Sequence, residues 1–206
     1  MVEVTKPTLG RLPIYLDYLR LLPRDVKYIS STAIAKALKL GGVQVRKDLN
    51  ALCGTGKPKI GYKRTDLIRS LENYTKQNHD SVAIIVGAGK LGKAFLDYKG
   101  FEKYGLTIDA AFEKDQTLIG KKENGKEIIS IDKLPEYCKE NSVSVGIIAV
   151  PHFAAQEVCD KLVSLGVKTI WNFAPVKLEV PDDVIVQQED MALSLAYLNY
   201  SLQLSK

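Results

Sequence analysis

The stretch SVAIIVGAGKLGKAF, residues 81–95, decides the fold of the larger part of this chain. It begins as a short apolar run, typical of a buried parallel strand, and a glycine-rich turn then leads into a helix. Gly87, Gly89 and Gly92 stand at the spacing GxGxxG, in the context that this motif requires. The glycines permit a tight turn, close approach of a pyrophosphate and close helix–strand packing. We therefore predict a phosphate-binding turn, with the anion held by amides at the helix N-terminus.

An acidic residue stands where a dinucleotide-binding fold needs one. Glu113 ends LTIDAAFE (106–113), the next strand expected after the glycine turn. A carboxylate there accepts hydrogen bonds from adenosine ribose hydroxyls and repels a 2′-phosphate. NAD(H) is therefore favoured over NADP(H), although the neighbouring Lys114 weakens that preference. Two alternatives stay open: a Rossmann domain without nucleotide, whose glycines serve packing, and a Glu113 that is an ordinary solvated strand end.

Strands and helices alternate through the rest of residues 79–188. Further strands are expected at SVGIIAVP (144–151), VKTIWNF (167–173) and DVIVQ (183–187), and ENGKEIIS (123–130) carries an Asn-Gly turn signal between short strands. This alternation predicts an α/β fold, a doubly wound parallel sheet, whose strand C-termini line a ligand crevice. The segments expected at that crevice are Ala149-Val150-Pro151 and Asn172-Phe173-Ala174-Pro175.

The last segment, EDMALSLAYLNYSLQLSK (189–206), is expected to be a helix that is apolar around most of its circumference. The surface of one domain covers only one side of a helix. We therefore expect a partner subunit to cover another side.

The segment 1–78 differs in charge from the rest of the chain. It carries a net charge of +9, whereas the segment 79–206 carries −4, and Arg69 is the last of the six arginines in the sequence. A small basic part joined to an acidic part indicates a module that binds a polyanion. Nucleic acid is the leading candidate, and a basic domain that is merely soluble is the alternative.

Two short helices separated by glycines indicate a helix-turn-helix. Ser30 or Ser31 is placed to cap the first helix, and Gly41-Gly42 end it. A second helix is expected from about Val43, with a cationic surface. The polar residues on that surface are Gln44, Arg46, Lys47 and Asn50.

The segment GTGKPKIGYKR (54–64) is expected to form a hairpin with a lysine-bearing tip, which completes a winged helix. Amphipathic helices are expected at 8–22 and 65–77, and the polar stretch QNHDS (77–81) marks a boundary. We therefore predict an N-terminal winged helix-turn-helix domain at 1–78, a Rossmann domain at 79–188 and a terminal helix at 189–206.

Composition excludes several classes of protein. The chain has 206 residues, 46% of them apolar, and no run approaches the ~18 consecutive apolar residues of a membrane span. The N-terminus has no apolar signal core, so we expect a cytoplasmic protein without a membrane partner. Three scattered cysteines and two histidines indicate neither a disulfide framework nor a metal site.

The sequence indicates no catalytic apparatus. His152 is the candidate histidine near the expected crevice, but we favour a surface residue at a helix start over an acid–base catalyst. Cys138 and Cys159 fall in helical patterns and are expected to be packed. We therefore predict a sensor of the nucleotide rather than an enzyme. The alternatives are a small NAD-dependent oxidoreductase that uses His152, and a CoA-binding Rossmann protein.

Several stretches, in this order, closely resemble the redox-sensing transcriptional repressor (Rex) family of bacteria over nearly the whole chain. They are RLPIYL (11–16), VQVRKDL (43–49), GAGKLGKAF (87–95), DYKGF (97–101), AVPHFAAQ (149–156) and LGVKTIWNFAPVKLEVP (165–181). The resemblance implies a homodimer whose terminal helices are swapped between subunits. It also implies binding to a palindromic operator of double-stranded DNA when NADH is low, and release by NADH, while NAD+ competes more weakly or supports the DNA-bound form.

The resemblance also implies roles for residues at the nucleotide. Val150, Pro151 and the segment 172–175 would lie on the nicotinamide side. Tyr98 would sense the cofactor state by hydrogen bonding and meet Asp190 of the other subunit, in a closed arrangement whose recognition helices miss successive half-sites. The full expected nucleotide-contacting set is Gly87, Ala88, Gly89, Lys90, Leu91, Gly92, Tyr98, Glu113, Lys114, Val150, Pro151, Asn172, Phe173, Ala174, Pro175 and Asp190.

The N-terminal domain would contact DNA. Arg46 and Lys47 are expected at phosphates or base edges, with Gln44 as a base reader and the wing lysines along the backbone or minor groove. The alternative for Arg46 is a salt bridge with Asp48 or Asp66. The full expected DNA-contacting set is Arg11, Ser31, Gln44, Arg46, Lys47, Lys57 and Lys59.

Three positions depart from the family pattern. Asp17 stands where some members have an arginine that links the domains, and Arg20, one turn later, is a candidate substitute. Met191 stands where some members have phenylalanine. The wing carries Lys57-Pro58-Lys59 where an Arg-Gly pair is frequent, which keeps positive charge but changes the expected minor-groove contact.

Overall fold

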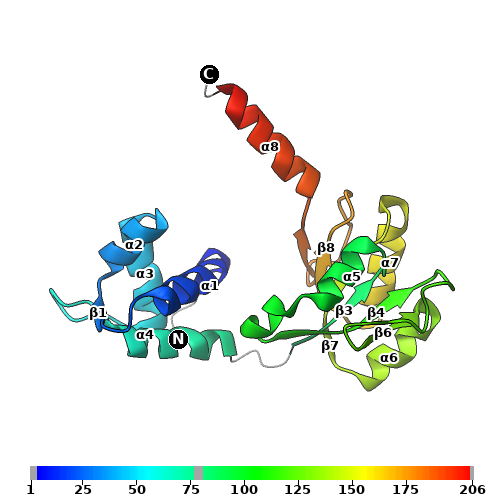
Figure 1. Ribbon diagram of the computed structural model, residues 1–206, viewed down its shortest axis with the longest axis horizontal. Helices are drawn as coiled ribbons and strands as arrows, with labels where there is room; N and C mark the ends of the chain where they lie inside the picture. The colour runs from blue at the N-terminus through cyan, green and yellow to red at the C-terminus, as the bar shows by residue number, and fades with distance from the viewer. Residues whose placement is uncertain (1–3, 77–80, 205–206) are drawn as a thin grey trace. The chain divides into compact units, whose positions relative to one another are not determined.

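The computed structural model describes residues 4–76 and 81–204, and the chain divides into two compact units between His79 and Asp80 (Figure 1). Unit 1 is Met1–His79 and unit 2 is Asp80–Lys206. The boundary expected at residues 78 and 79 lies outside the described residues. Each unit has its own apolar core.

Unit 1 is a helical bundle with a two-stranded sheet at one side (Figure 1). Its helices are α1 (Lys6–Leu21), α2 (Ser31–Leu38), α3 (Gly42–Cys53) and α4 (Arg64–Lys76), and strand β1 (Tyr28–Ile29) pairs antiparallel with β2 (Tyr62–Lys63). Side chains from every helix meet in one core because each helix carries an apolar stripe. The larger members of this core are Leu12, Tyr15, Leu16, Leu19, Ile34, Val45, Leu49, Leu52, Leu67 and Leu71.

The helix-turn-helix is formed by α2 and α3. Ser30, not Ser31, caps α2, because its hydroxyl accepts from the Ala33 amide at 3.1 Å. Lys39 ends α2 in the left-handed conformation, with φ of 54°. Only a short connection follows before α3 begins at Gly42, so the first helix fixes the direction of the second.

The wing differs from the expected hairpin. Residues Lys57–Gly61 form a tight loop closed by a single bridge, and the strand that follows pairs with β1 rather than with a strand inside the wing. Gly61 has φ of +89°, and any side chain there would overlap the carbonyl oxygen of Ile29. Glycine therefore lets the chain turn directly against β1, which leaves too few residues for a second wing strand.

A buried carboxylate ties α3 to α1. Asp48, only 5% exposed, accepts hydrogen bonds from Arg11 Nε at 2.7 Å and Nη2 at 3.0 Å, from the Tyr15 hydroxyl at 2.6 Å and from the Thr8 hydroxyl at 2.9 Å. Burial alone would raise the pKa of Asp48, but these hydrogen bonds outweigh it and hold the pKa below its usual value. Burial and the carboxylate raise the pKa of Tyr15 to about 12, so its hydroxyl remains a donor.

Unit 2 contains a sheet of seven strands in the order β5-β6-β4-β3-β7-β8-β9. All neighbours pair in parallel except β5 with β6, which confirms the doubly wound α/β prediction. The strands are β3 (Ser81–Val86), β4 (Leu106–Glu113), β5 (Lys122–Glu123), β6 (Lys126–Ser130), β7 (Val143–Ile148), β8 (Thr169–Asn172) and β9 (Ile185–Gln188).

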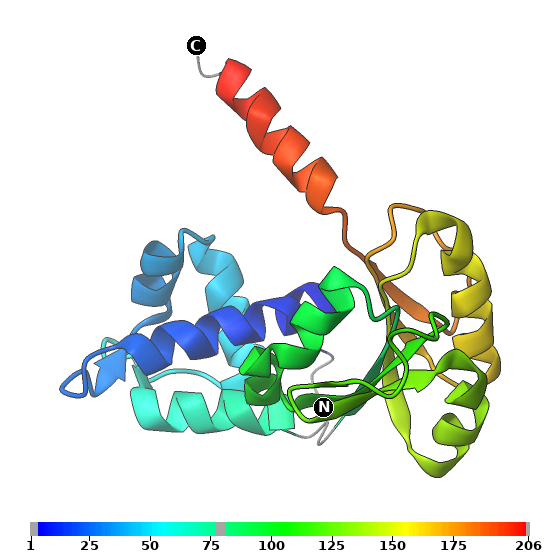
Figure 2. The ribbon, with the colours of Figure 1, turned by 45° about the vertical axis from the view of Figure 1, so that its right-hand side comes forward.

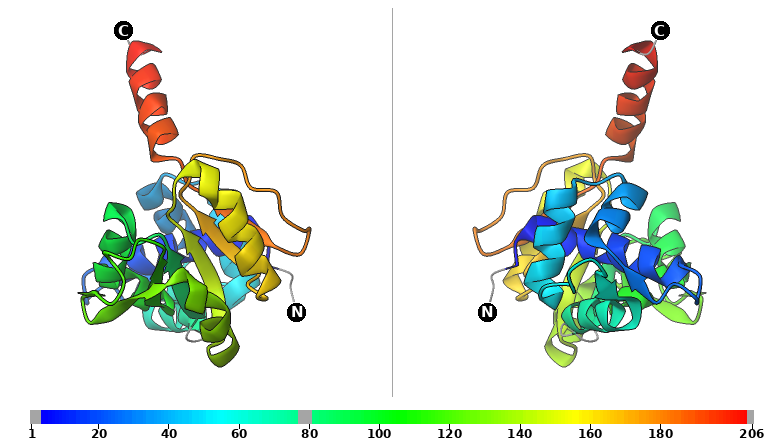
Figure 3. Two further views of the ribbon diagram at one scale, coloured as in Figure 1. Left: turned by 90° about the vertical axis from the view of Figure 1, so that its right-hand side faces the viewer. Right: turned by 90° about the vertical axis from the view of Figure 1, so that its left-hand side faces the viewer.

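Helices cover both faces of this sheet (Figure 3). The helical segments are α5 (Lys90–Asp97), η1 (Lys99–Tyr104), η2 (Ile131–Lys133), α6 (Leu134–Glu140) and α7 (His152–Ser164). Alternate residues of β3 serve the two faces: Ile84 and Val86 pack with α6 and α7, whereas Ala83 and Ile85 pack with α5. This double burial explains why the strand is apolar throughout rather than alternating.

The expected Asn-Gly turn joins β5 to β6. Asn124 and Gly125 have φ of 51° and 78°, the pair of left-handed conformations that a two-residue hairpin turn requires. This turn supplies the one antiparallel pair of the large sheet.

The terminal helix α8 (Met191–Leu204) extends away from the sheet of unit 2 (Figure 2). Its apolar side chains are exposed around the helix; among the largest exposed fractions are those of Tyr197 (71%), Leu195 (68%) and Leu193 (67%). No helix of the described residues, α8 included, is long and apolar enough to cross a membrane. The helix is therefore an apolar surface without cover in this single chain.

We predict that Asp48→Asn lowers the free energy of unfolding at pH 7 by about 2–3 kcal/mol, because Arg11 and Tyr15 lose a charged acceptor in a buried place. Since the pKa of Asp48 is lower in the folded than in the unfolded chain, its stabilisation is present at neutral pH and is lost as the pH falls below about 4. Urea unfolding followed by circular dichroism should show the gap between wild type and variant shrinking towards pH 3. The exposed Asp182→Asn serves as control, and a gap that does not depend on pH would contradict this account.

Candidate functional site

At two of the three motif glycines, packing within the protein leaves no space for a side chain. Gly87 has φ of +104°, and a Cβ atom there would lie 2.5 Å from the carbonyl oxygen of Ala149. At Gly92, the first buried residue of α5, a Cβ atom would overlap the carbonyl oxygen of Gly87. The turn between β3 and α5 therefore brings backbone against backbone, as the spacing predicts.

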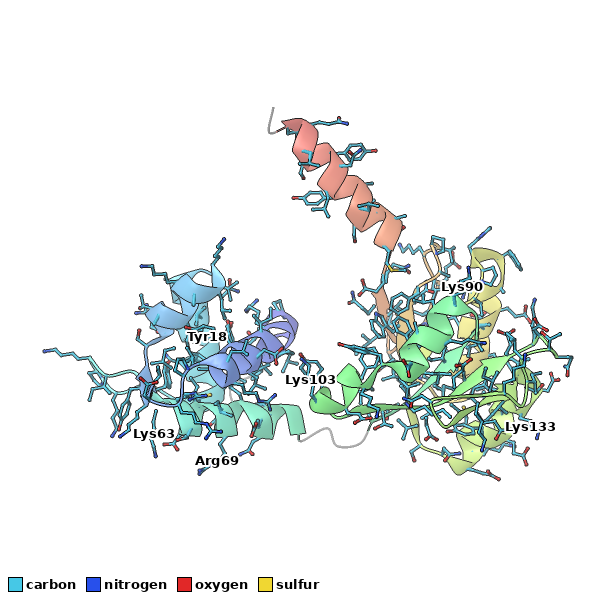
Figure 4. The ribbon with its side chains drawn as sticks, viewed as in Figure 1. Tyr18, Lys63, Arg69, Lys90, Lys103 and Lys133 are labelled. Atoms are coloured by element: carbon cyan, nitrogen blue, oxygen red, sulfur yellow. The ribbon has the colours of Figure 1, made fainter. Side chains whose placement is uncertain are left out.

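The third glycine faces open space. A Cβ atom on Gly89 would have no neighbour within 4 Å, so packing in this chain does not explain a glycine at that position. Gly89 is also the N-cap of α5, and no side chain caps the helix. The amides of the first helical turn have no intrahelical acceptors, and Lys90 stands beside them at the start of α5 (Figure 4). This arrangement suits an anion that lies against Gly89.

Glu113 lies at the opposite side of the same turn. Its carboxylate accepts from the amide of Ala88 at 2.8 Å through Oε2, and from those of Lys114 at 2.8 Å and Asp115 at 3.1 Å through Oε1. It is therefore held in place by three backbone donors rather than standing as a loose strand end. A carboxylate has about four lone-pair sites, so it keeps capacity for a further donor.

A cavity of about 260 Å³ opens beside Glu113 at the carboxyl ends of β3, β4 and β7. Val150 and Pro151 line it together with Glu113 and Lys114, so these two residues, which the family resemblance places on the nicotinamide side, lie beside the acid. The reason is topological, because β7 and β4 flank β3 and their ends meet there. Further residues that line this cavity, outside the expected nucleotide-contacting set, are Val86, Phe112, Ile131, Ala154, Glu157 and Val158.

The spacing of these missed residues carried a signal. Ala154, Glu157 and Val158 stand three and four residues apart, which places them on one face of α7. The sequence pattern indicates the face of α7 that packs on the sheet, which carries Ala155, Cys159 and Leu162. The residues of α7 that line the cavity could not be predicted in the same way, because they depend on the residue at which the helix starts.

Asn172 has a structural role that differs from the expected ligand contact. It is fully buried, its Nδ2 donates to the carbonyl oxygens of Ala174 and Val176 and to Gln188 Oε1, and its Oδ1 accepts from the Ala174 amide. These bonds use the side chain inside the protein and hold the loop that follows β8. Ala174 is buried with it, whereas Pro175 is exposed.

An aromatic cluster connects that loop to α5. The ring of Phe95 stacks on Trp171 with centroids 5.5 Å apart and contacts Phe173 at 4.8 Å. Phe101 joins the cluster, and Tyr98 packs on its edge with centroids 4.9 Å apart while remaining 57% exposed. Phe173 is therefore a packing residue in this chain, and Tyr98 is the member that reaches the surface.

Asp190 caps the terminal helix. Its Oδ1 accepts from the amide of Leu193 at 2.9 Å, and its carbonyl oxygen accepts from the hydroxyl of Ser194. The preceding residue, Glu189, accepts from Trp171 Nε1 at 3.3 Å. The start of α8 is thus tied to the aromatic cluster.

Four of the residues expected at DNA line one hollow of unit 1. Ser31 from the start of α2, Arg46 from α3, and Lys57 and Lys59 from the wing surround it. Asn50 and Tyr62 line it too, and Asn50 Oδ1 accepts from the Tyr62 hydroxyl at 2.8 Å. The structure thus brings cations from the recognition helix and the wing to one surface, with Lys63 nearby on β2 (Figure 4).

The two acids considered as partners for Arg46 have other partners. Asp48 is held by Arg11, and Asp66 lies 3.6 Å from Lys63 Nζ. Arg11, expected at DNA, is instead part of the buried network described above, and only 17% of its side chain is exposed. Gln44 and Lys47 line a second hollow between α3 and the start of α1. Arg20, considered as a link between domains, pairs with Glu72 of its own unit at 2.7 Å.

The candidate catalytic groups lie outside any built reaction centre. His152 is the exposed first residue of α7, and its ring lies edge-on to Phe153. Burial raises the pKa of the Cys138 and Cys159 thiols, which disfavours the nucleophilic thiolate. Among the described residues, no group of three or more potential ligands could hold a metal ion.

A winged helix-turn-helix joined to a Rossmann domain with an open phosphate turn defines a class of protein: transcriptional regulators that carry a nucleotide-binding type of domain. Two family models match the chain accordingly. "Putative DNA-binding protein N-terminus" matches residues 3–50, and "CoA binding domain" matches residues 78–176.

Full-length relatives make the assignment specific. The chain is 40% identical to the redox-sensing transcriptional repressor Rex of Treponema denticola over 201 residues, which are 97% of this chain and 96% of the relative. This chain belongs to the Rex family of redox-sensing transcriptional repressors. Its relatives are named as repressors and not as enzymes.

Solved structures agree with this assignment. RSP, a Rex-family repressor, in complex with β-NAD+ and operator DNA matches with a TM-score of 0.90 at 34% identity, covering 100% of this chain and 95% of that chain. RSP in complex with β-NADH matches with a TM-score of 0.84 at 33% identity, covering 100% of this chain and 97% of that chain.

We predict that Gly92→Ala lowers the free energy of unfolding of unit 2 by about 2–3 kcal/mol, whereas Gly89→Ala, at the N-cap of α5, lowers it by less than about 1 kcal/mol. The first substitution forces a methyl group into the Gly87 carbonyl, and the second adds a methyl group to open space. The single tryptophan, Trp171, lies in unit 2, so its fluorescence during urea unfolding measures the difference. Equal losses for both variants would show that the space at Gly89 is not open in solution.

Proposed function

We propose that this chain represses transcription by binding operator DNA through unit 1 and releases it when unit 2 binds NADH, with NAD+ as the weaker or opposing ligand. The observation that carries the proposal is the open space at Gly89, which lies between two glycines that packing requires, at a helix start that no side chain caps. RSP, of the same family, has been solved with β-NADH and with β-NAD+ and operator DNA, which supports both ligands.

The nucleotide fits the site in a defined orientation. The pyrophosphate lies against Gly89 and the amides of Lys90 and Leu91, where the helix N-terminus favours negative charge. Glu113 would hold the adenosine ribose by accepting from one of its hydroxyls, and the cavity lined by Val150 and Pro151 would take the adenosine. This replaces the expected nicotinamide role of these two residues. Tyr98, the exposed member of the aromatic cluster, would meet the nicotinamide, as the family resemblance implies.

Unit 1 presents a surface suited to the DNA backbone. Arg46, Lys57 and Lys59 meet phosphates around the hollow that they line, and Ser31 adds a hydroxyl at the start of α2. Lys47 and Gln44 extend the surface along α3, which lies in the major groove. Arg11 lines the same hollow as Gln44 and Lys47, and its ion pair with Asp48 holds it beside α3.

The active form is a homodimer that binds a palindromic operator. The exposed apolar side chains of α8 supply the contact with the partner, whose surface covers them, and Met191 is one of the residues that the partner buries. Tyr98 and the partner's Asp190 lie together and register the state of the nicotinamide. A repressor acts at the chromosome, so we place the protein in the cytoplasm.

We predict that NADH lowers the anisotropy of a labelled DNA duplex bound to the protein, and that excess NAD+ opposes this release. The duplex is one selected by the protein from a pool of random double-stranded DNA. Gly89→Val fills the space for the pyrophosphate and should weaken the NADH effect by about tenfold or more, while DNA binding without nucleotide is unchanged. Release by CoA but not by NADH would favour a CoA-binding protein, and turnover of NADH with any substrate would favour an oxidoreductase.

We predict that Leu195→Glu with Leu198→Glu converts a dimer into a monomer, because charged groups cannot be buried unpaired in an apolar interface. Light scattering after size exclusion measures the mass directly. Ser201→Glu on the same helix, at a residue whose hydroxyl bonds to the Tyr197 carbonyl, introduces one charge as a milder comparison. Wild-type protein that is monomeric at micromolar concentration would argue against α8 as a dimer contact.

A further inference from the structure

The amide of Gln44 lies against the guanidinium of Arg11. Gln44 is the third residue of α3, is exposed, and lies near the N-terminus of the helix that we place in the major groove. Arginine carries five N–H donors and no acceptor, so only the amide oxygen of Gln44 can face it favourably. In that orientation Oε1 accepts from Arg11 Nη2 at 2.9 Å and from Nη1 at 3.1 Å.

Arg11 is itself a rigid anchor. Its Nε and Nη2 bind both carboxylate oxygens of Asp48, at 2.7 Å and 3.0 Å, and this two-point contact fixes the plane of the guanidinium. Asp48 is 5% exposed and also accepts from Tyr15 and Thr8, so the anchor cannot rotate without leaving a buried charge unpaired. The Arg11 hydrogens that do not bind Asp48 are therefore held towards the amide of Gln44.

This anchoring changes what Gln44 can offer to a base. A glutamine with a free amide offers a donor and an acceptor side by side, which matches N6 and N7 of adenine. In this chain the acceptor is already used, so the outward atom is Nε2 with its two hydrogens. Gln44 thereby becomes a donor of hydrogen bonds and nothing else.

We propose that Gln44, held by the Arg11–Asp48 pair, selects guanine at one position of each operator half-site and discriminates against adenine. Guanine offers two adjacent acceptors in the major groove, O6 and N7, whereas adenine replaces one of them by an N6 donor. Cytosine offers a donor, and thymine a single acceptor beside a methyl group. The inference rests on the proposed placement of α3 in the major groove.

The neighbouring cations differ from Gln44 in charge and in position. Lys47, one turn further along α3, lies on the same hollow as Gln44, and its ammonium can move between phosphates and bases. Arg46 lines the other hollow with the wing lysines. Gln44 is the uncharged member of this group, so it contributes little to non-specific attraction and its effect should be confined to a single base position.

The test is a selection from a pool of random double-stranded DNA, followed by sequencing, for wild type and Gln44→Ala. We expect wild type to enrich a palindrome, and Gln44→Ala to lose preference at one symmetric pair of positions, where wild type selects guanine. On wild-type protein, replacing that guanine by 7-deazaguanine, which lacks N7, or by adenine should weaken binding roughly 5- to 100-fold. These substitutions are in the DNA, so the readout does not depend on how a variant folds.

Variants of the anchor sharpen the test. Arg11→Met combined with Asp48→Leu replaces the buried pair by apolar groups of similar size. Because Thr8 and Tyr15 then lose this acceptor, the fold of the double variant is checked by circular dichroism before DNA binding is measured. The double variant frees the amide of Gln44 to turn, and we expect it to accept adenine at that position nearly as well as guanine. Gln44→Glu, which offers only acceptors, should reject guanine, and Gln187→Glu in unit 2 makes the same change of charge as control.

The outcomes separate this inference from the proposed function. Adenine at the Gln44-dependent position overturns the inference, as does a Gln44→Ala variant that selects the same sequence as wild type or loses affinity equally for all sequences. In each of those cases the repressor function stands. If wild-type protein enriches no sequence at all, the proposed function fails first.

Discussion

The turn between β3 and α5 is the constraint on which unit 2 depends. The carbonyl oxygen of Gly87 occupies the place where a side chain at residue 92 would stand, so strand and helix meet backbone against backbone. That contact aims the N-terminus of α5 across the ends of the neighbouring strands. The Glu113 carboxylate then binds the Ala88 amide from the adjacent strand end, which holds the turn from its other side. The open space at Gly89 is what this packing leaves over, and it has the electrostatic character of an anion site.

In unit 1 the main constraint is that the cationic helix α3 must be held rigidly against the rest of the domain. A recognition helix must turn its cations to solvent, so its contact with the rest of the domain cannot rely on those residues. Val45, Leu49 and Leu52 supply apolar burial, and Asp48 adds directional bonds to α1. The acid offsets the positive charge of Arg11 inside the domain and leaves Arg46 and Lys47 for the outer surface. The net charge of the sequence could not distinguish an internal arginine such as Arg11 from a surface arginine such as Arg46, because every arginine adds the same charge.

The predictable features were those that depend on local pattern. The glycine spacing, the apolar runs and the Asn-Gly pair were enough to predict the strands of the sheet and its turns. Each of these patterns reflects a conformation that the backbone must adopt within a few residues. What was missed depends on contacts distant in sequence. Arg11 meets Asp48 from another helix, and Asn172 bonds to Gln188 on the next strand, so neither role was visible in its own neighbourhood. The wing is a shorter hairpin than expected, closed by one antiparallel bridge between Lys57 and Gly61, because the strand after Gly61 pairs with β1, which precedes the whole helix-turn-helix in the sequence.

A continuous series of contacts joins the phosphate turn to the terminal helix within unit 2. Helix α5 carries Phe95, whose ring stacks on Trp171, and the indole nitrogen of Trp171 donates to Glu189 beside the cap of α8. Adjacency of this kind transmits nothing by itself, since a ligand shifts an equilibrium only by its difference in affinity for two states. The exposed α8 is the element whose packing can differ between states, because its apolar side chains have cover only from outside this chain. Under the proposed function, a preference of NADH or NAD+ for one position of α5 would change how α8 packs against the partner subunit, and so change the geometry of the dimer.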